Sequence, residues 1–137
     1  MVEIDEFTIR TTLHVLAVAV WVGGQITLAG LLPAVRKLDD DQAGKKLARQ
    51  FNRIAWPAFA LAVVTGIWNI AEVDIVDRST AYQVLLLFKL LVVALSGVAA
   101  FVHTQTSNRA LLAIFGALTG ITAIVAVFLG VLLLAST

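Results

Sequence analysis

Residues 110–135 read ALLAIFGALTGITAIVAVFLGVLLLA, a run without a single charged side chain. A helix rises about 1.5 Å per residue, so about 20 apolar residues cross the hydrocarbon core of a bilayer. This run is therefore long enough to span a membrane as one helix. Three more windows have the same apolar character, at roughly residues 9–35, 54–71 and 81–102. The sequence predicts four membrane-spanning helices.

The composition supports a membrane setting for the whole chain. Of its 137 residues, 60% are hydrophobic and only 14% are charged, and the mean hydropathy is +0.95. Soluble domains carry about 25% charged residues. The net charge of +1 argues against nucleic acid as a partner, because there is no basic excess to neutralise phosphates. We expect a single domain, residues 1–137, with membrane lipid as its surroundings.

Short connectors between the four windows indicate the topology. Helices joined by short loops pack as antiparallel neighbours, so the predicted fold is an all-α, integral membrane four-helix bundle with up-down topology. Pro57 is expected in the first turn of the second helix, where a missing backbone donor costs little. Ser79 and Thr80 can cap the third helix. The absence of cysteine excludes disulfides and thiolate metal sites.

Basic residues indicate which side of the membrane each connector occupies. Lys and Arg are retained on the cytoplasmic side. Arg10 and Arg78 are the basic residues of one side, and Arg109 lies on the other. That second side also carries the six basic residues after the first span: Arg36, Lys37, Lys45, Lys46, Arg49 and Arg53. We therefore expect both termini to be extracytoplasmic, in a multi-pass protein of a bacterial or archaeal cytoplasmic (inner) membrane.

Polar residues within the apolar windows fall into stripes at helical spacing. A polar side chain in hydrocarbon is costly, so such stripes are expected to face the interior of the bundle. On the third window the polar residues recur every seventh position, the period of one seam in a left-handed bundle. The three stripes are Arg10, His14, Trp21 and Gln25; Thr65, Trp68, Asn69 and Glu72; and Tyr82, Lys89, Ser96 and His103.

Depth in the membrane separates the two histidines. His14, Asn69, Glu72 and Lys89 are expected near the extracytoplasmic side, where they could converge, whereas His103 is expected about 20 Å away along the bilayer normal. Within one subunit, His14 and His103 could not ligate the same metal. Lys89 is the sharper signal, because a lysine at mid-helix costs about 3 kcal/mol.

Each of these residues also has a structural interpretation. A transmembrane histidine often only forms a hydrogen bond between helices, and this is the expected role of His103. Lys89 could pair with Glu72 or with an anionic ligand such as a haem propionate. Trp21 and Trp68 fit packing roles, with stacking on a porphyrin as the alternative. Gly116 and Gly120 form a GxxxG motif, which is suited to close helix packing or to a homodimer.

Three stretches resemble a known membrane superfamily. LHVLAVAVWVGG (13–24), RIAWPAFALAVVTGIW (53–68) and FKLLVVALSGVAAFVH (88–103) are similar to CopD-type copper resistance proteins and HemJ-type protoporphyrinogen oxidases. The resemblance implies that the family's first-helix histidine is His14 and its third-helix lysine is Lys89. In the HemJ branch these two residues are associated with haem b and with porphyrinogen oxidation, and a quinone or a redox partner protein would accept the electrons. The Trp-Val-Gly-Gly form at 21–24 looks more like the CopD branch.

These observations leave three functional hypotheses. The first is a haem-b-binding redox protein, with His14 and Lys89 as catalytic residues and axial or propionate ligands; Trp21, Trp68 and Asn69 would contribute to the cofactor site. The second is a copper transport or resistance protein with His14 as a metal ligand, although Cu(I) prefers cysteine and methionine and the chain has no Cys and only Met1. The third is a structural subunit whose polar stripes only pack helices.

Overall fold

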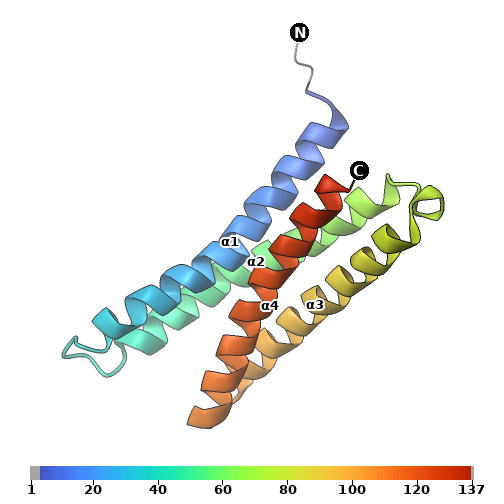
Figure 1. The fold of residues 1–137 in the computed structure, drawn as a ribbon. Helices are drawn as coiled ribbons and strands as arrows, with labels where there is room; N and C mark the ends of the chain where they lie inside the picture. Colours follow the sequence, from blue (N-terminus) through green and yellow to red (C-terminus); the bar gives the residue numbers. More distant parts are fainter. Residues whose placement is uncertain (1–3, 137) are drawn as a thin grey trace. The chain divides into compact units, whose positions relative to one another are not determined.

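The computed structural model describes residues 4–136, and within that range all long elements are helices (Figure 1). Each of the four long helices has the length and apolar composition needed to cross a membrane. A single turn of 3-10 helix, η1, lies between the second and the third. The helices are α1 (Glu6–Val35), α2 (Ala43–Ala71), α3 (Thr80–Gln105) and α4 (Arg109–Ala135), with η1 at Ile75–Asp77.

The chain folds as two compact units, and each is a helical hairpin. The first, Met1–Val73, contains α1 and α2; the second, Asp74–Thr137, contains α3 and α4. In each unit the two helices run antiparallel side by side (Figure 1). Residues 36–42 connect the first pair and residues 106–108 connect the second. Because these connections are short, the second helix of each hairpin packs antiparallel to the first.

Side-chain caps begin three of the helices. Asp5 accepts hydrogen bonds from the backbone N–H and the hydroxyl of Thr8, and these bonds hold the pKa of the Asp5 carboxyl below its usual value. Ser79 caps α3 by accepting from the N–H of Tyr82, as the sequence predicted. Asn108 caps α4.

The position of Pro57 differs from the expectation. The second helix begins at Ala43 and not near residue 54, so Pro57 lies in the middle of α2 and the prediction of a first-turn proline was wrong. The early start has a packing reason: the ring of Phe51 lies over Gly24 of α1, so the basic segment before the apolar window already has an apolar side against the first helix. Pro57 itself is exposed and removes one backbone donor from the helix.

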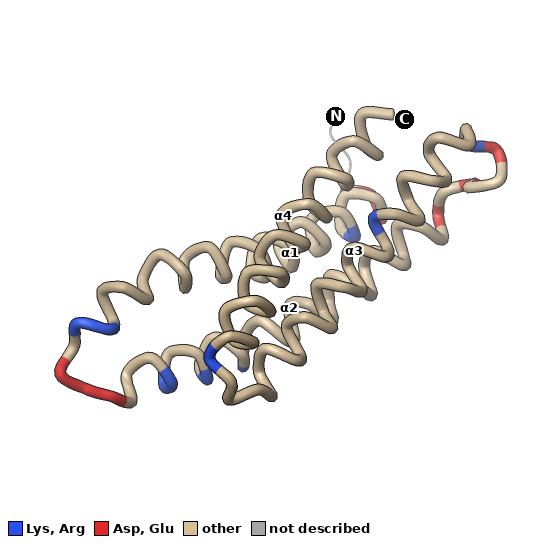
Figure 2. The backbone as a smooth tube through the Cα atoms, turned by 60° about the horizontal axis from the view of Figure 1, so that its bottom comes forward, with Lys and Arg blue, Asp and Glu red and all other residues tan. Residues whose placement is uncertain are grey.

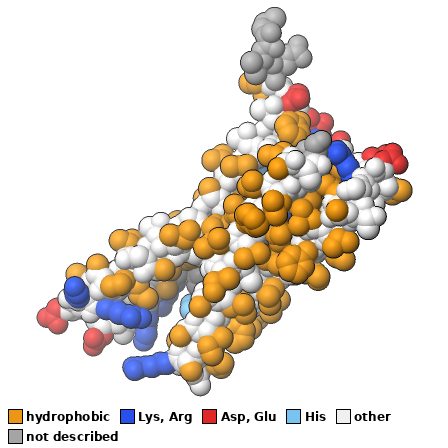
Figure 3. Space-filling model, viewed as in Figure 1, with side chains coloured by type: hydrophobic (Ala, Val, Ile, Leu, Met, Phe, Trp, Pro, Cys, Tyr) orange, Lys and Arg blue, Asp and Glu red, His pale blue; other side chains and the backbone are white. Residues whose placement is uncertain are grey.

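Charge and apolar side chains are segregated along both hairpins. Lys, Arg, Asp and Glu gather mainly at the ends of the helices and in the connections (Figure 2). Hydrophobic side chains cover the helical middles on the face seen in Figure 3, and many large ones are exposed, such as Leu91 and Phe128, each 60%. Such an apolar exterior on four long helices is what a lipid environment requires.

Candidate cofactor site on the first hairpin

Three polar contacts join α1 to α2 near the open end of the first hairpin, by which we mean the end formed by the start of α1 and the end of α2. Their α1 members are spaced four residues apart, so successive contacts lie about one helical turn apart. From the open end inward, Trp68 Nε1 donates to Glu6 Oε1 at 3.1 Å, Arg10 Nε donates to Asn69 Oδ1 at 2.9 Å, and His14 Nδ1 lies 3.0 Å from Thr65 Oγ1.

The hydrogen bonds of Thr65 determine which nitrogen of His14 carries a proton. The Thr65 hydroxyl, 2% exposed, donates to the Leu61 carbonyl at 2.6 Å. Because that bond uses the hydroxyl proton, the oxygen can only accept from His14, and Nδ1 must be protonated. A neutral His14 ring then has its lone pair on Nε2.

Glycine on α2 makes room for this imidazole. The Cε1 atom of His14 lies 3.2 Å from the point where a Cβ on Gly66 would stand. Any larger residue at position 66 would press on the ring. The position of the His14 ring against Thr65 therefore depends on residue 66 having no side chain. The half-buried His14 ring is thus held between the hydroxyl of Thr65 and the backbone of α2 at Gly66.

Beyond His14, toward the 36–42 turn, the seam between α1 and α2 becomes aromatic. Trp21 is 6% exposed, and its ring centroid lies 4.5 Å from that of Phe59 and 5.7 Å from that of Trp56. The structure therefore places Trp21 in a packed cluster within the hairpin. Trp68, also predicted as a cofactor contact, is 38% exposed near the open end.

The second hairpin places its heptad residues against α4. Ser96 Oγ donates to the Thr119 carbonyl at 3.3 Å, and His103 Nδ1 donates to the Leu112 carbonyl at 2.8 Å. Lys89 Nζ lies 3.1 Å from the point where a Cβ on Gly130 would stand. Tyr82, the fourth member, is buried. Three members of the predicted stripe, Lys89, Ser96 and His103, thus lie on the face of α3 that packs on α4.

Glycines under polar side chains are common to both hairpins. Gly116 lies under His103, whose Cε1 is 3.0 Å from the position of an added Cβ, and Gly130 lies under Lys89. The predicted GxxxG glycine Gly116 therefore serves a contact inside the chain. Gly23 and Gly30 have nothing within 4 Å of an added Cβ.

Two further polar atoms of α1 have no hydrogen-bond partner among residues 4–136. They are Thr11 Oγ1 and Gln25 Nε2, both buried. Because they are fourteen residues apart, they lie on the same side of the helix. Thr119 Oγ1 of α4 is in the same condition. Buried polar atoms of this kind generally bond to water or to a ligand.

The predicted site residues divide between the two units. His14, Trp21, Trp68 and Asn69 all belong to the first hairpin, and Lys89 belongs to the second. The contacts of Asn69 with Arg10 and of His14 with Thr65 were not predicted. The two members of each pair lie at similar distances along the chain from the 36–42 turn, which is the signal that could have found them.

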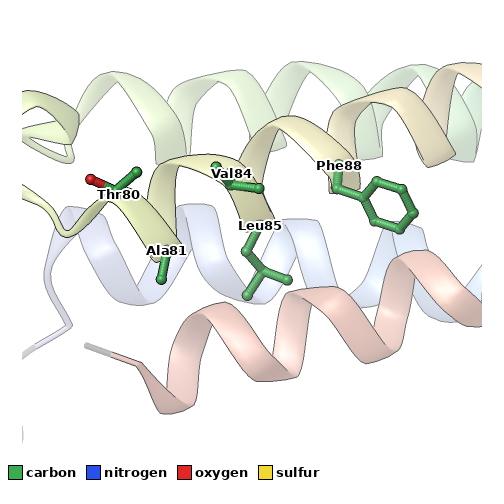
Figure 4. A pocket seen from close by; sticks show the side chains of 5 residues that line it. All are labelled: Thr80, Ala81, Val84, Leu85 and Phe88. Carbon is green, nitrogen blue, oxygen red and sulfur yellow. The ribbon is translucent and has the colours of Figure 1, made fainter.

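The side chains present suit some ligands better than others. Within residues 4–136 there is no group of three or more His, Cys, Asp or Glu side chains that could hold a metal ion. A shallow, open hollow of about 480 Å³ runs along α3 (Figure 4). It is lined by apolar side chains and one threonine: Thr80, Ala81, Val84, Leu85 and Phe88. This lining offers no acid, base or ligating group.

Comparison of the chain with protein-family models, with curated proteins and with solved structures gave no match.

Proposed function

We propose that this chain is a haem-b-binding redox protein of a bacterial or archaeal cytoplasmic membrane, related to the CopD-type and HemJ-type proteins, in which His14 would ligate the haem iron. The single observation that carries the proposal is the hydrogen bond between His14 and Thr65. Histidines that ligate metals commonly donate their second ring N–H to a protein oxygen, which fixes the tautomer and the ring orientation. In His14 this arrangement directs ligation to Nε2.

The donor set fits haem better than it fits a copper ion. A porphyrin supplies four ligands itself, so one imidazole from the protein is enough to hold its iron. A copper site made by protein side chains needs several ligands, and residues 4–136 contain no group of three or more candidates. Thr11 Oγ1, a buried hydroxyl less than one turn from His14 on α1, adds a polar atom that a ligand could satisfy. Copper bound at His14 is the alternative proposal.

When bound, haem b supplies one-electron redox chemistry, and the chain supplies ligation, orientation and exclusion of water. His14 would ligate the haem iron, and Thr65 and Gly66 hold the His14 ring in place. The aromatic cluster around Trp21 packs between α1 and α2 on the side toward the 36–42 turn. For Lys89 we propose the role of second ligand or propionate partner; its resemblance to the family lysine supports this. Porphyrinogen oxidation or electron transfer would also need an acceptor, a quinone or a partner protein.

We further propose that this all-α chain is an integral membrane four-helix bundle of up-down topology with both termini extracytoplasmic. The apolar exterior of all four helices supports insertion, and the basic residues around the 36–42 turn support a cytoplasmic position for that turn. A homodimer through Gly116 and Gly120 is a further proposal, which the GxxxG spacing supports.

Haem binding is tested by absorbance spectroscopy of the purified protein, before and after haemin is added and then dithionite. We expect a Soret band and its shift on reduction. His14→Ala should abolish the band, whereas His103→Ala should retain it. His103 is a matched control, because its ring also forms an Nδ1 hydrogen bond and also rests on a glycine. Lys89→Gln should weaken haemin binding.

A wild-type protein without a Soret band in the presence of haemin would refute the haem proposal. Equal binding by wild type and His14→Ala would show that His14 is not the ligand. Metal analysis of the same samples addresses the copper alternative, which predicts copper in the wild type and background copper in His14→Ala.

The packing contacts of both seams favour a second candidate function, that of a structural membrane subunit. Ser96 and His103 each bond to a backbone carbonyl of the neighbouring helix, which is the behaviour of residues that join helices. If His14→Ala and Lys89→Gln leave the fold and the cellular phenotype unchanged, this structural role is the correct one.

A further inference from the structure

We infer that Arg10 is the carboxylate-binding residue of the site and that the ligand held at His14 carries its acid groups toward the open end of the first hairpin. This inference rests on the proposed haem function and extends it. Arg10 precedes His14 by one helical turn on the same face of α1, and Asn69 follows Thr65 by one turn on α2. The contact between Arg10 and Asn69 therefore lies next to the contact between His14 and Thr65, on the side toward the open end of the hairpin.

Two contacts hold the Arg10 side chain in place, and among residues 4–136 neither of them uses its terminal nitrogens. Nε donates to Asn69 Oδ1 at 2.9 Å, and the guanidinium lies over the Phe7 ring at 5.4 Å. Within residues 4–136 the single ion pair joins Lys46 to Asp40, so Arg10 has no carboxylate partner there. A guanidinium oriented through Nε can present its two terminal NH₂ groups to a carboxylate as a fork.

The neighbouring acidic residues, Glu6 and Asp5, do not act as the carboxylate partner of Arg10. Glu6, one turn further toward the open end, accepts from Trp68. Asp5 accepts from Thr8, and the charge of Arg10 makes only the smallest contribution to the lowered pKa of its carboxyl. The donors of Arg10 are thus oriented and half-buried beside an imidazole. The ligand class that fits both groups is a metal tetrapyrrole with free carboxylates, such as haem with its propionates.

The test compares haemin with its dimethyl ester, which has the same iron and ring but no free carboxylate. Both are titrated by difference absorbance into the wild-type protein, Arg10→Gln and Arg78→Gln, all in lipid nanodiscs. Glutamine keeps an amide that can bond to Asn69 but removes the charge. Arg78 is the matched control, because it also lies near a helix end and over an aromatic ring, that of Tyr82 at 5.5 Å.

We expect Arg10→Gln to weaken haemin binding by about tenfold or more, as the loss of a charge-assisted hydrogen bond implies. Binding of the ester should be the same in both proteins, and Arg78→Gln should bind haemin as the wild type does. If Arg10→Gln binds haemin normally, or loses haemin and ester equally, the inference is wrong while the haem function stands. If the wild type binds neither compound, the haem function itself is wrong, and the role of Arg10 fails with it.

Discussion

An imidazole resting on a glycine is the residue-scale feature that both hairpins share. His14 rests on Gly66 and His103 on Gly116, and each ring donates from Nδ1 to an oxygen of the opposite helix. The acceptors differ: a hydroxyl for His14 and a backbone carbonyl for His103. Glycine is costly inside a helix, so its presence under each ring is explained by the space the ring needs.

Gly66→Ala and Gly23→Ala form a matched pair that tests this explanation. An added methyl at position 23 meets nothing within 4 Å, so Gly23→Ala should raise the free energy of unfolding by up to about 1 kcal/mol. At position 66 the methyl would press on the ring at 3.2 Å. Gly66→Ala should therefore bring no such gain and should weaken haemin binding. Denaturant titration in detergent, followed by circular dichroism, measures the stability; equal gains with unchanged haemin binding would contradict the packing role of Gly66.

At the scale of elements, the two helices of each hairpin contact each other along one seam, and the type of side-chain contact changes along that seam. In the first hairpin polar contacts occupy the open end, and the aromatic cluster of Trp21, Trp56 and Phe59 occupies the half nearer the turn. In lipid, helices associate by close packing and hydrogen bonds, because the tails are as apolar as the side chains. The seam contacts are therefore what holds α1 to α2.

Trp21→Ala tests the aromatic half of that seam. Removing a buried indole leaves a cavity between the helices, and we expect the free energy of unfolding to fall by about 2 kcal/mol or more. Phe88→Ala is the control, because Phe88 is 54% exposed on α3 and should change stability by less than about 0.5 kcal/mol. The same denaturant titration compares the two variants. A loss in Phe88→Ala as large as that in Trp21→Ala would show that exposed and seam aromatics contribute alike.

At the scale of the whole molecule, the distribution of charge supports the proposed orientation in a membrane. The absence of cysteine makes this testable with single introduced cysteines. In intact cells we expect Val76→Cys, in the exposed connection before α3, to react with a membrane-impermeant maleimide, and Asp41→Cys, in the 36–42 turn, to react only after lysis. The reverse labelling pattern would place the termini inside.

Much of the fold was predictable because it depends on length and composition. Each of the four long helices contains one of the apolar windows, as expected if backbone groups in an apolar environment are satisfied within a helix. Lys89, Ser96 and His103 of the predicted heptad lie on the α4 side, because residues seven apart share a face. The start of α2 was not predicted, since the packing of Phe51 over Gly24 extends the helix through a charged segment.

By itself, the sequence determined the number of helices, their apolar exterior and the faces on which His14, Lys89 and His103 lie, because hydrophobic periodicity is a property of neighbouring residues along one chain. Only the tertiary structure decided the partners across each seam: Thr65 and Gly66 for His14, Asn69 for Arg10, and Leu112 for His103. These depend on the register between antiparallel helices. That register is set by the turn and by which small residues let the opposite side chains approach, information that no single helix contains.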